Sequence, residues 1–401
     1  MPPAPRPGMV NRMWFPNHDE DRVQIRAATS DAMNTGPPST VPLPKLDPGL
    51  GKRLHAQKTT PSFTYTSKDL AIYQPPKSGF IAHLPKAWVP YAELIRINES
   101  AGILYFYYPF LFGSLLAACL LKTITSPSTL FTANSILFAA SFMARSAACA
   151  WTDVLNAGHD HQVSRCRLRP VVRGAVTPLS GYIYAAVLFV MWLGITASLP
   201  GLHLRQLASY VVFIMIYPLS KRYTYYAPLC MGFTLATGVI VGSSVLGVDV
   251  IALRAAGGSC YAVNNAIAAV LCLWLASVMW IVIVEVVQDF QGLKDDRQAG
   301  IVSLAVAHHH DAKPLLSSAA VVQLGLLIAT GLLVGAGPLY FAGACGGTAV
   351  FLVWMLLSVD LESPESCLWW FRHGHWLVGG SIAGGLATEY VSRRYGLWGG
   401  Y

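Results

Sequence analysis

Two short stretches of the sequence carry acidic and amide side chains at a regular spacing. The first set is Asp153, Asn156 and Asp160, and the second is Asp289, Gly292, Asp295 and Asp296. Positions i, i+3 and i+7 share one face of an α-helix, so each set can present oxygen atoms in one direction. Carboxylate and amide oxygens suit a hard cation such as Mg²⁺, and no cysteine or histidine set at zinc spacing lies nearby. Because Mg²⁺ usually joins carboxylates to phosphate oxygens, the two sets predict a phosphorylated ligand.

Basic residues near the acidic sets supply the second half of a phosphate site. They are Arg165, Arg169, Lys221 and Arg222. Guanidinium groups match phosphate oxygens in bidentate geometry, so we expect these side chains to hold the phosphate groups. The alternative is that they only fix the orientation of the chain in a membrane, and the two roles are compatible. For the acidic sets, the alternative is a solvated loop just outside the membrane.

Long apolar segments surround these residues and predict the fold. Of 401 residues, 54% are hydrophobic and 12% are charged, and apolar runs of nearly 20 residues recur. Lipid offers the backbone no hydrogen-bond partners, and the runs are continuous rather than alternating, so we predict an all-α, multi-pass transmembrane bundle of about nine helices. The predicted spans, of which the fourth is short, are 103–121, 130–151, 182–199, 205–219, 227–247, 265–288, 315–335, 339–358 and 373–391.

The net charge of +8 reflects membrane topology rather than nucleic-acid binding. The loops after the second, fourth, sixth and eighth spans hold ten lysines and arginines, whereas the loops after the first, third, fifth and seventh hold three. Positive residues concentrate in cytosolic loops, so we expect both acidic sets and the N-terminus in the cytosol. The lipid bilayer is therefore an expected partner, and nucleic acid is not.

Residues 1–85 differ from the rest because they are rich in proline, serine and threonine and have no apolar period. We expect a disordered cytosolic tail there and one transmembrane domain over 86–401. The tail lacks the apolar core of a signal peptide, and its acidic stretch HDEDR (18–22) is untypical of a mitochondrial presequence. The expected location is the endoplasmic reticulum.

Five segments together resemble the UbiA superfamily of intramembrane prenyltransferases. TDVLNAGHD (152–160) and VSRCRLRP (163–170) are similar to its first signature, NDxxDxxxD followed by V-x-R-T/C-x-x-R-P. The form RCRLRP followed by VVRGAVTP looks most like fungal members that prenylate aromatic or polyketide acceptors in meroterpenoid pathways. Further similarity lies in PYAELIRINESAG (90–102), YPLSKRYTYYAP (217–228) and QGLKDDRQAGIVSLAV (291–306).

The resemblance implies an enzyme that ionises an isoprenyl diphosphate, such as farnesyl diphosphate, and joins the allylic cation to an acceptor carbon. Mg²⁺ would be the cofactor, held by Asp153, Asn156, Asp160, Asp289, Asp295 and Asp296. Arg96 would join the basic residues on the diphosphate, or it would instead cap the membrane interface. The implied catalytic residues are Asp153, Asp160, Asp296 and Tyr217. Aromatic rings can stabilise a cation, and Tyr223, Tyr225 and Trp151 could share that role or serve as interfacial anchors.

Three positions depart from the family pattern. Thr152 replaces asparagine, Asn156 replaces the middle aspartate, and Gly292 replaces the first aspartate of the second motif. An asparagine can still ligate through its carbonyl oxygen, but Gly292 brings no ligand. Asp289 lies one helical turn earlier on the same face, and we expect it to replace the missing carboxylate.

Two other functions stay open on the sequence alone. A membrane terpene cyclase of the same fold would act on farnesyl diphosphate without an acceptor. A transporter or a lipid-binding protein that lost its metal is the non-catalytic alternative, although no inverted repeat is evident and Asp153, Asp160, Asp295 and Asp296 are retained.

Overall fold

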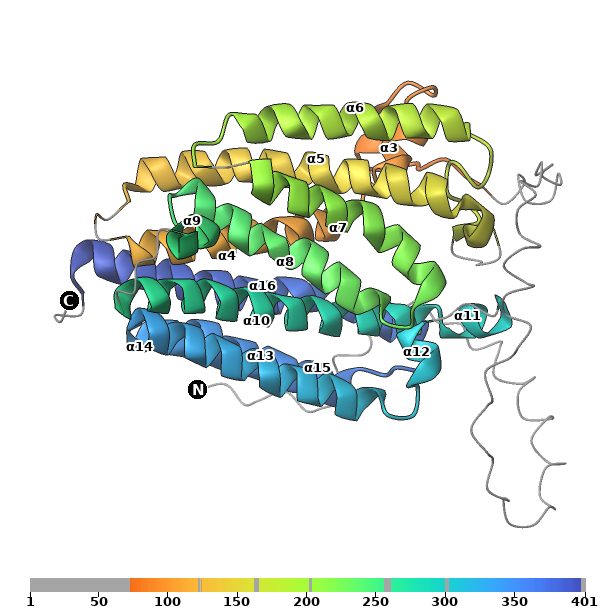
Figure 1. The fold of residues 1–401 in the computed structure, drawn as a ribbon. Coiled ribbons are helices and arrows are strands. Elements are labelled where there is room, and N and C mark those ends of the chain that lie inside the picture. Colours follow the sequence, from red (N-terminus) through yellow and green to blue (C-terminus); the bar gives the residue numbers. More distant parts are fainter. Residues whose placement is uncertain are drawn as a thin grey trace, which may run out of the picture. The chain divides into compact units, whose positions relative to one another are not determined.

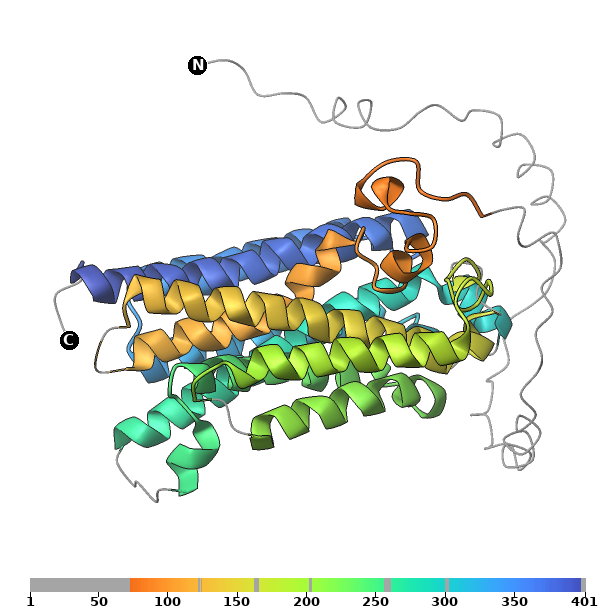
Figure 2. The same cartoon turned by 90° about the horizontal axis from the view of Figure 1, so that it is seen from above.

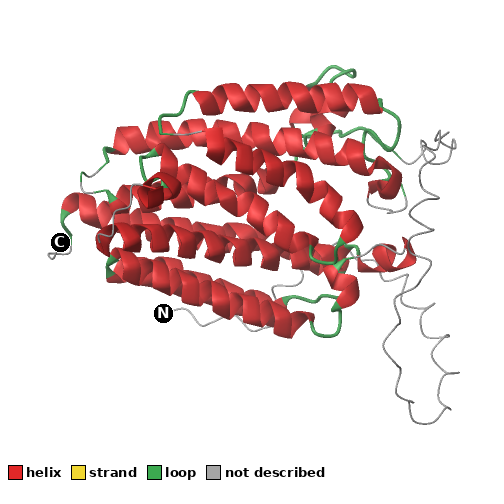
Figure 3. Cartoon of the chain, viewed as in Figure 1, coloured by secondary structure: helices red, strands yellow, loops and turns green. Residues whose placement is uncertain are grey.

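A computed structural model describes residues 73–121, 123, 125–161, 166–201, 204–255, 261–299 and 303–397. The chain divides into two units, Met1–Phe63 and Thr64–Tyr401, and all described residues belong to the second. Their regular elements are helices, and no strand occurs among them (Figure 3). Most of the expected tail at 1–85 therefore lies outside the described residues.

Nine long helical segments build the described part of the chain (Figure 1). They are α4 (Ser100–Leu120), α5 (Pro127–Asp160), α6 (Pro178–Ala197), α7 (Leu204–Tyr223), α8 (Ala227–Val245), α10 (Tyr261–Gln291), α13 (Ala312–Val334), the run of α14 (Pro338–Tyr340), η4 (Phe341–Gly347) and α15 (Thr348–Ser358), and α16 (Pro364–Tyr395). Two short helices precede them, η2 (Phe80–His83) and α3 (Val89–Leu94), and three lie between them, α9 (Val250–Ala255), α11 (Leu293–Ala299) and α12 (Leu304–Ala307).

Each predicted span falls on one long segment, so the prediction of an all-α transmembrane bundle is confirmed. Within the described residues, six helices are long and apolar enough to cross a membrane: those at 101–120, 178–197, 227–245, 262–291, 312–334 and 338–358. Helices α5 and α16 are longer than most of these but less apolar. The fourth span, predicted as short, is a helix of 20 residues because polar residues extend α7 beyond its apolar core.

The long helices pack side by side in an order that differs from their order in the chain. Helix α6 packs on α5, α5 on α4, and α4 on both α8 and α16, while α10 packs on α8, α13 and α16. Figures 1 and 2 place α3 and α11 at one end of the bundle. This end is called the aspartate end below, because α5 and α10 also carry their acidic sets there.

Small residues let α4 and α8 approach until their backbones touch. A Cβ atom at Gly113 would clash with the carbonyl oxygen of Val239, and one at Gly242 would clash with the carbonyl oxygen of Phe110. Helix pairs in membranes commonly use such small residues for close packing, since the hydrophobic effect does not drive helices together in lipid. The contact closes the space between these two helices deep in the bundle.

A described segment ahead of α3 is fastened to the aspartate end. The hydroxyl of Tyr73 donates a hydrogen bond to Glu93 at 2.6 Å, and Arg173 forms an ion pair with the same carboxylate. The guanidinium carbon of Arg173 also lies 3.8 Å from the centre of the Tyr73 ring. Burial and the hydrogen bond to Glu93 raise the pKa of Tyr73 to about 12, so the phenol stays protonated. The segment from residue 73 to the expected boundary at 85 is thus described and in contact with the bundle.

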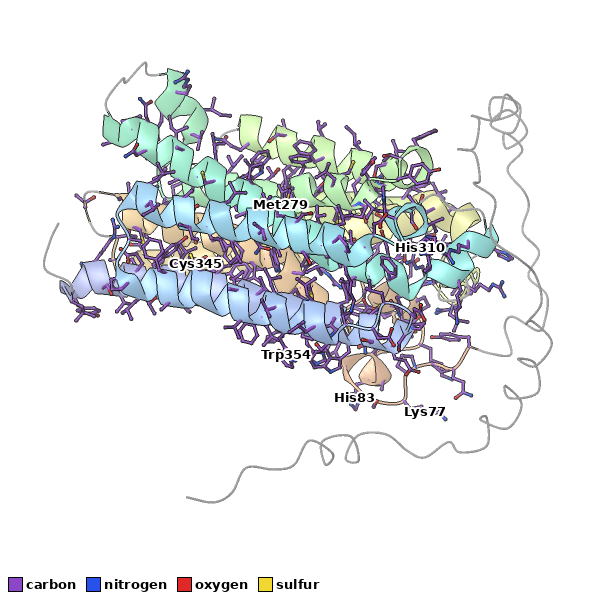
Figure 4. The ribbon with its side chains drawn as sticks, turned by 90° about the horizontal axis from the view of Figure 1, so that it is seen from below. Lys77, His83, Met279, His310, Cys345 and Trp354 are labelled. Carbon is purple, nitrogen blue, oxygen red and sulfur yellow. The ribbon has the colours of Figure 1, made fainter. Side chains whose placement is uncertain are left out.

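The opposite end of the bundle is tied together by Arg393 near the end of α16. Its guanidinium group donates to the carbonyl oxygens of Cys119 at 2.7 Å and Val334 at 2.6 Å, and it pairs with Glu389. In Figure 4, Lys77, His83 and His310 lie at the aspartate end, whereas Cys345 lies much farther along the bundle. Helix α16 therefore begins at the aspartate end and finishes at the other.

Candidate active site

A cavity of about 230 Å³ lies inside the aspartate end of the bundle. Residues from both acidic sets line it: Asn156, Asp160, Asp289 and Asp296. They come from α5 and, more than a hundred residues later in the chain, from the end of α10 and from α11. The structure therefore brings the two sets to one space, because α5 extends past the predicted limit at 151 and carries Asp160 on the same helix as Asp153.

Asp153 anchors two arginines beside this cavity. Its carboxylate is 1% exposed, and its Oδ1 atom lies 2.8 Å from Arg96 and 3.1 Å from Arg169. Arg169 also pairs with Asp160. Arg169 lies in a turn in which its amide donates to the Cys166 carbonyl oxygen at 3.0 Å. The predicted phosphate ligands Arg96 and Arg169 thus stand together at the mouth of the cavity.

The backbone at Arg96 adopts an unusual conformation for a residue with a side chain. Its φ angle is 53°, a left-handed conformation that costs on the order of 1–3 kcal/mol unless neighbours hold it. Arg145 holds it by donating hydrogen bonds to the carbonyl oxygens of Ile95, Arg96 and Glu99 at 3.1 to 3.3 Å. The carboxylate of Asp153 raises the pKa of Arg96 above its ordinary value, so the guanidinium stays charged.

Arg145 was not predicted as a site residue, although one signal in the sequence marks it. It is a charged residue inside a predicted span, and such residues are functional by default. Its side chain is 3% exposed, and it lines the cavity. Further lining residues that were not predicted are Tyr105, Cys149 and Gln288. The Tyr105 hydroxyl donates to Glu285, which lies one turn before Asp289 and also lines the cavity, at 3.2 Å.

The second acidic set sits where α10 passes into α11. The amide of Gly292 donates to the Asp289 carbonyl oxygen at 3.1 Å, and the amide of Asp296 donates to the Gly292 carbonyl oxygen at 2.9 Å. These bonds carry the helical turn through Gly292, so Asp289 and Asp296 both reach the cavity. Asp289 thus supplies a carboxylate to this wall of the cavity, whereas Gly292 has no side chain to offer.

Apolar side chains form the inner part of the cavity. They include Phe106, Ala148, Ile214 and Met231. Among the aromatic residues proposed to face a cation, Tyr217 lines the cavity. Tyr223 is 72% exposed and Tyr225 is 47% exposed, so these two face outward. Trp151 packs against the ring of Tyr182 at 5.6 Å and does not line the cavity.

Four of the predicted site residues lie outside the described residues in whole or in part. Arg165 falls in the gap at 162–165. The side chains of Lys221, Arg222 and Asp295 are also outside, although the backbones of these residues belong to α7 and α11. Their predicted roles stay predictions.

A wider groove adjoins the cavity on the side of α16. It has a volume of about 1420 Å³ and shares Arg96, Arg169 and Phe371 with the cavity. Asp153 lines it, and Trp354, Trp369 and Trp376 are among its aromatic residues. The two spaces meet at the arginine pair.

The oxygen-rich lining fits Mg²⁺ when a phosphorylated ligand is bound. Among the described side chains, no three histidines, cysteines or acids form a ready-made metal cluster. Mg²⁺ seldom needs one, because it keeps several waters and binds one or two carboxylates together with phosphate oxygens. Asp289, Asp296, Asp160 and Asn156 supply such oxygen donors around one cavity.

This chain is similar to known proteins in both sequence and fold. The model of the UbiA prenyltransferase family matches residues 106–378. The chain is similar to prenyltransferase stbC of Stachybotrys bisbyi, with 30% identity over 336 residues that cover 81% of this chain and 95% of the relative. It is also similar to the mitochondrial 4-hydroxybenzoate polyprenyltransferase of Schizosaccharomyces pombe, with 28% identity over 328 residues, 81% of this chain and 86% of the relative.

Two solved structures share the arrangement of helices. A UbiA homolog from Archaeoglobus fulgidus, bound to GPP and Mg²⁺, superimposes with a TM-score of 0.54 at 15% identity, covering 74% of this chain and 98% of that chain. The apo structure of a UbiA homolog from Aeropyrum pernix K1 gives 0.55 at 20% identity, covering 71% and 96%. The matched residues 106–378 form more than half of the chain and carry both acidic sets, so this chain belongs to the UbiA prenyltransferase family.

Proposed function

We propose that this protein transfers an isoprenyl group, such as farnesyl, from its diphosphate to a carbon atom of an aromatic or polyketide acceptor. The observation that carries the proposal is the cavity itself. Its mouth joins acidic side chains from α5, α10 and α11 to two arginines, and its inner part is apolar. A diphosphate with a hydrocarbon tail has these same two halves.

Arg96 and Arg169 hold the diphosphate in this proposal, with Arg165, Lys221 and Arg222 as further expected contacts. Guanidinium groups bind phosphate oxygens in pairs of parallel hydrogen bonds. In the described structure both arginines pair with Asp153. An incoming diphosphate competes for the two guanidinium groups and leaves carboxylate oxygens for a cation.

The proposed ligands of Mg²⁺ are Asp153, Asn156, Asp160, Asp289, Asp295 and Asp296. When bound, the ion neutralises charge that develops on the departing diphosphate. Asp153, Asp160 and Asp296 are the proposed catalytic carboxylates, because they come from both sets and hold the head group in place. The arginines stabilise the same negative charge, and their ion pairs with the buried Asp153 orient them before the diphosphate binds.

The apolar wall protects and stabilises the allylic cation. Side chains such as Phe106 and Ile214 exclude water that would otherwise add to the cation. The ring of Tyr217 lines the same space and can face the positive charge, an interaction of about 0.5–2 kcal/mol. Tyr217 is therefore the proposed aromatic catalytic residue.

The adjoining groove supports a transferase over a cyclase. A cyclase needs room for one isoprenoid, whereas a transferase must also admit an acceptor next to the reacting carbon. The groove of about 1420 Å³ reaches the arginine pair and has a wall of aromatic and polar residues. It supplies that second space beside the diphosphate site.

The location proposed for the protein is the membrane of the endoplasmic reticulum, with the N-terminus and the aspartate end in the cytosol. The excess of lysine and arginine in the loops at that end supports this orientation. Water-soluble diphosphates would then reach the cavity from the cytosol.

To test the proposal, membranes that contain the protein are incubated with farnesyl diphosphate and Mg²⁺, once with a phenolic acceptor and once without it. We expect prenylated product only when donor, acceptor and Mg²⁺ are present, and no product after chelation by EDTA or in Asp296→Asn. Hydrocarbon formed without acceptor would instead support the cyclase. Undegraded diphosphate under every condition, after other chain lengths have been tried, would contradict both enzymatic functions.

A further inference from the structure

We propose that the aromatic pair of Phe110 and Tyr210 closes the inner end of the cavity and sets the longest prenyl chain that the enzyme accepts. The inference rests on the proposed function, because it assigns the apolar end of the cavity to the tail of the donor. It goes further by naming the residues that determine chain-length specificity.

The cavity ends at the same depth on four helices. Its innermost lining residues on these helices are Phe106 on α4, Ala148 on α5, Ile214 on α7 and Thr234 on α8, whose hydroxyl donates to the Cys230 carbonyl oxygen of its own helix. Arg145 lies one turn deeper on α5, but its guanidinium group turns back to the carbonyl oxygens of residues 95–99. Counted inward from the aspartate end, the cavity therefore stops one helical turn before the next layer of side chains.

That next layer is filled. Residues four positions farther in lie on the same faces of these helices, and they are Phe110, Ala144, Tyr210 and Gly238. The rings of Phe110 and Tyr210 are 2% and 0% exposed and meet edge to face, 5.7 Å between centres. A Cβ atom at Gly238 would lie 3.0 Å from the Phe110 ring, so the ring rests directly on α8.

The cluster is continuous with the cavity wall. Ile214 belongs to the same apolar cluster as Phe110 and Tyr210, and Ala148 packs against it. Behind Tyr210 stands Trp192, with the two ring centres 5.6 Å apart. A tail that grows past Ile214 and Ala148 therefore meets two buried rings with a third behind them.

Main-chain contact prevents the layer from opening. Just below it, α4 and α8 touch at Gly113 and Gly242, where any side-chain atom would clash with a carbonyl oxygen. Interiors packed at this density do not admit further methylene groups without strained side chains or shifted backbones. Rotation of Phe110 alone cannot create a channel, because the helix backbones close the space behind it.

The length of the cavity fits a short chain. Twelve residues separate Asp160 from Ala148 on α5, which corresponds to about 18 Å at 1.5 Å per residue. An extended chain gains about 1.2 Å per bond. Farnesyl diphosphate has roughly sixteen bonds from its far phosphate to its last main-chain carbon, about 19 Å on the same scale. One more isoprene unit adds about 5 Å and would run into Phe110 and Tyr210.

We call the layer of Phe110 and Tyr210 the floor of the cavity. Binding of thiolodiphosphate analogues, which do not ionise, tests its role without an acceptor. The purified protein with Mg²⁺ is titrated with the ten-, fifteen- and twenty-carbon analogues and with inorganic pyrophosphate. We expect the fifteen-carbon analogue to bind at least about tenfold more tightly than the twenty-carbon one. In Phe110→Leu this preference should fall by about threefold or more, because the smaller side chain deepens the cavity.

A second variant, which adds volume to the cavity instead of removing it, keeps the proposal testable if Phe110→Leu does not fold. Ala148→Leu fills the inner end of the cavity. It should weaken binding of the fifteen-carbon analogue by about tenfold and leave binding of the ten-carbon analogue unchanged. Ala139→Leu, on an exposed face of the same helix, is the matched control and should keep the wild-type ranking. Equal binding of all lengths by the wild type, or unchanged ranking in both floor variants, overturns the proposed floor. Failure of every analogue and of pyrophosphate to bind overturns the proposed function itself.

Discussion

At the scale of single residues, Asp289 is the proposed replacement for the carboxylate that the second acidic set lacks at Gly292. Gly292 lacks a ligand, whereas Asp289 lines the cavity together with Asp296. We therefore expect Asp289→Ala to lower Mg²⁺-dependent turnover by on the order of 100-fold, since charge-stabilising groups contribute at least that much. The Mg²⁺ concentration at half-maximal rate should also rise. Steady-state assays over a Mg²⁺ series measure both effects.

The control for this change is Glu365→Gln. Glu365 is an exposed acid in the first turn of α16, at the same end of the bundle, and its loss should leave the Mg²⁺ dependence unaltered. Asp289 would lose its assigned role if Asp289→Ala kept its turnover while Asp296→Ala abolished it.

We expect Arg145 to act on the proposed phosphate site through the backbone of Arg96. Its three hydrogen bonds hold the carbonyl groups on either side of a residue with a φ angle of 53°. A lysine keeps the charge but loses the planar fork of donors. We expect Arg145→Lys to raise KM for the prenyl diphosphate by about tenfold and to change kcat less, because the main effect is on the placement of Arg96.

A purely structural role for Arg145 gives a different result. Arg145→Lys would then lower the thermal unfolding temperature and the amount of active enzyme, but the surviving enzyme would show the wild-type KM. Measuring KM and unfolding on the same preparation separates the two cases.

At the scale of helices, the contact between α4 and α8 should be unusually sensitive to added volume. Replacing glycine by alanine inside a helix ordinarily stabilises it by about 1 kcal/mol. At Gly113 the new methyl group would clash with the Val239 carbonyl oxygen, so the helices must separate. We expect Gly113→Ala to destabilise the protein by roughly 1–3 kcal/mol, seen as a lower unfolding temperature in detergent.

Gly194→Ala is the matched control for this prediction. Gly194 lies in α6, where nothing comes within 4 Å of an added Cβ atom. The same chemical change should there leave the unfolding temperature unchanged or raise it slightly. Similar losses at both positions would show that helix contact at Gly113 is not the cause.

The helices themselves were predictable because lipid leaves the backbone few choices. All nine spans follow from continuous apolar runs, since only hydrogen-bonded helices satisfy the backbone there. Their ends were harder to predict. Helix α5 continues to Asp160 and α10 to Gln291, because polar residues beyond the lipid core still continue the helical turn. Hydropathy marks the crossing segment and not the full helix.

At the scale of the whole molecule, spacing predicted the members of the site but not the contacts among them. The i, i+3, i+7 pattern indicated which acids share a helix face, and the structure brings Asp160 and Asp296 to one cavity. The pairing of Asp153 with Arg96 joins residues 57 positions apart, and no local pattern encodes it. The layer that closes the inner end of the cavity could not be predicted either. Helices α4, α7 and α8 show no preferred apolar face, so the sequence does not indicate which side chains point inward.

The direction of the whole bundle in the membrane follows from the ends of α16. This helix has 32 residues and is about 48 Å long, well beyond a hydrocarbon core of about 30 Å. Glu365 near its start and Tyr395 at its end must therefore emerge on opposite sides. The lysine and arginine distribution predicts that the Glu365 side faces the cytosol.

Single cysteines at these two positions report the orientation directly. In sealed microsomes with the cytosolic face outward, we expect a membrane-impermeant maleimide to label Glu365→Cys without detergent and Tyr395→Cys only after detergent. The wild-type chain sets the background, because its described cysteines are buried or half-buried. The reverse pattern would place the diphosphate site in the lumen, and equal labelling before detergent would show that α16 does not cross the bilayer.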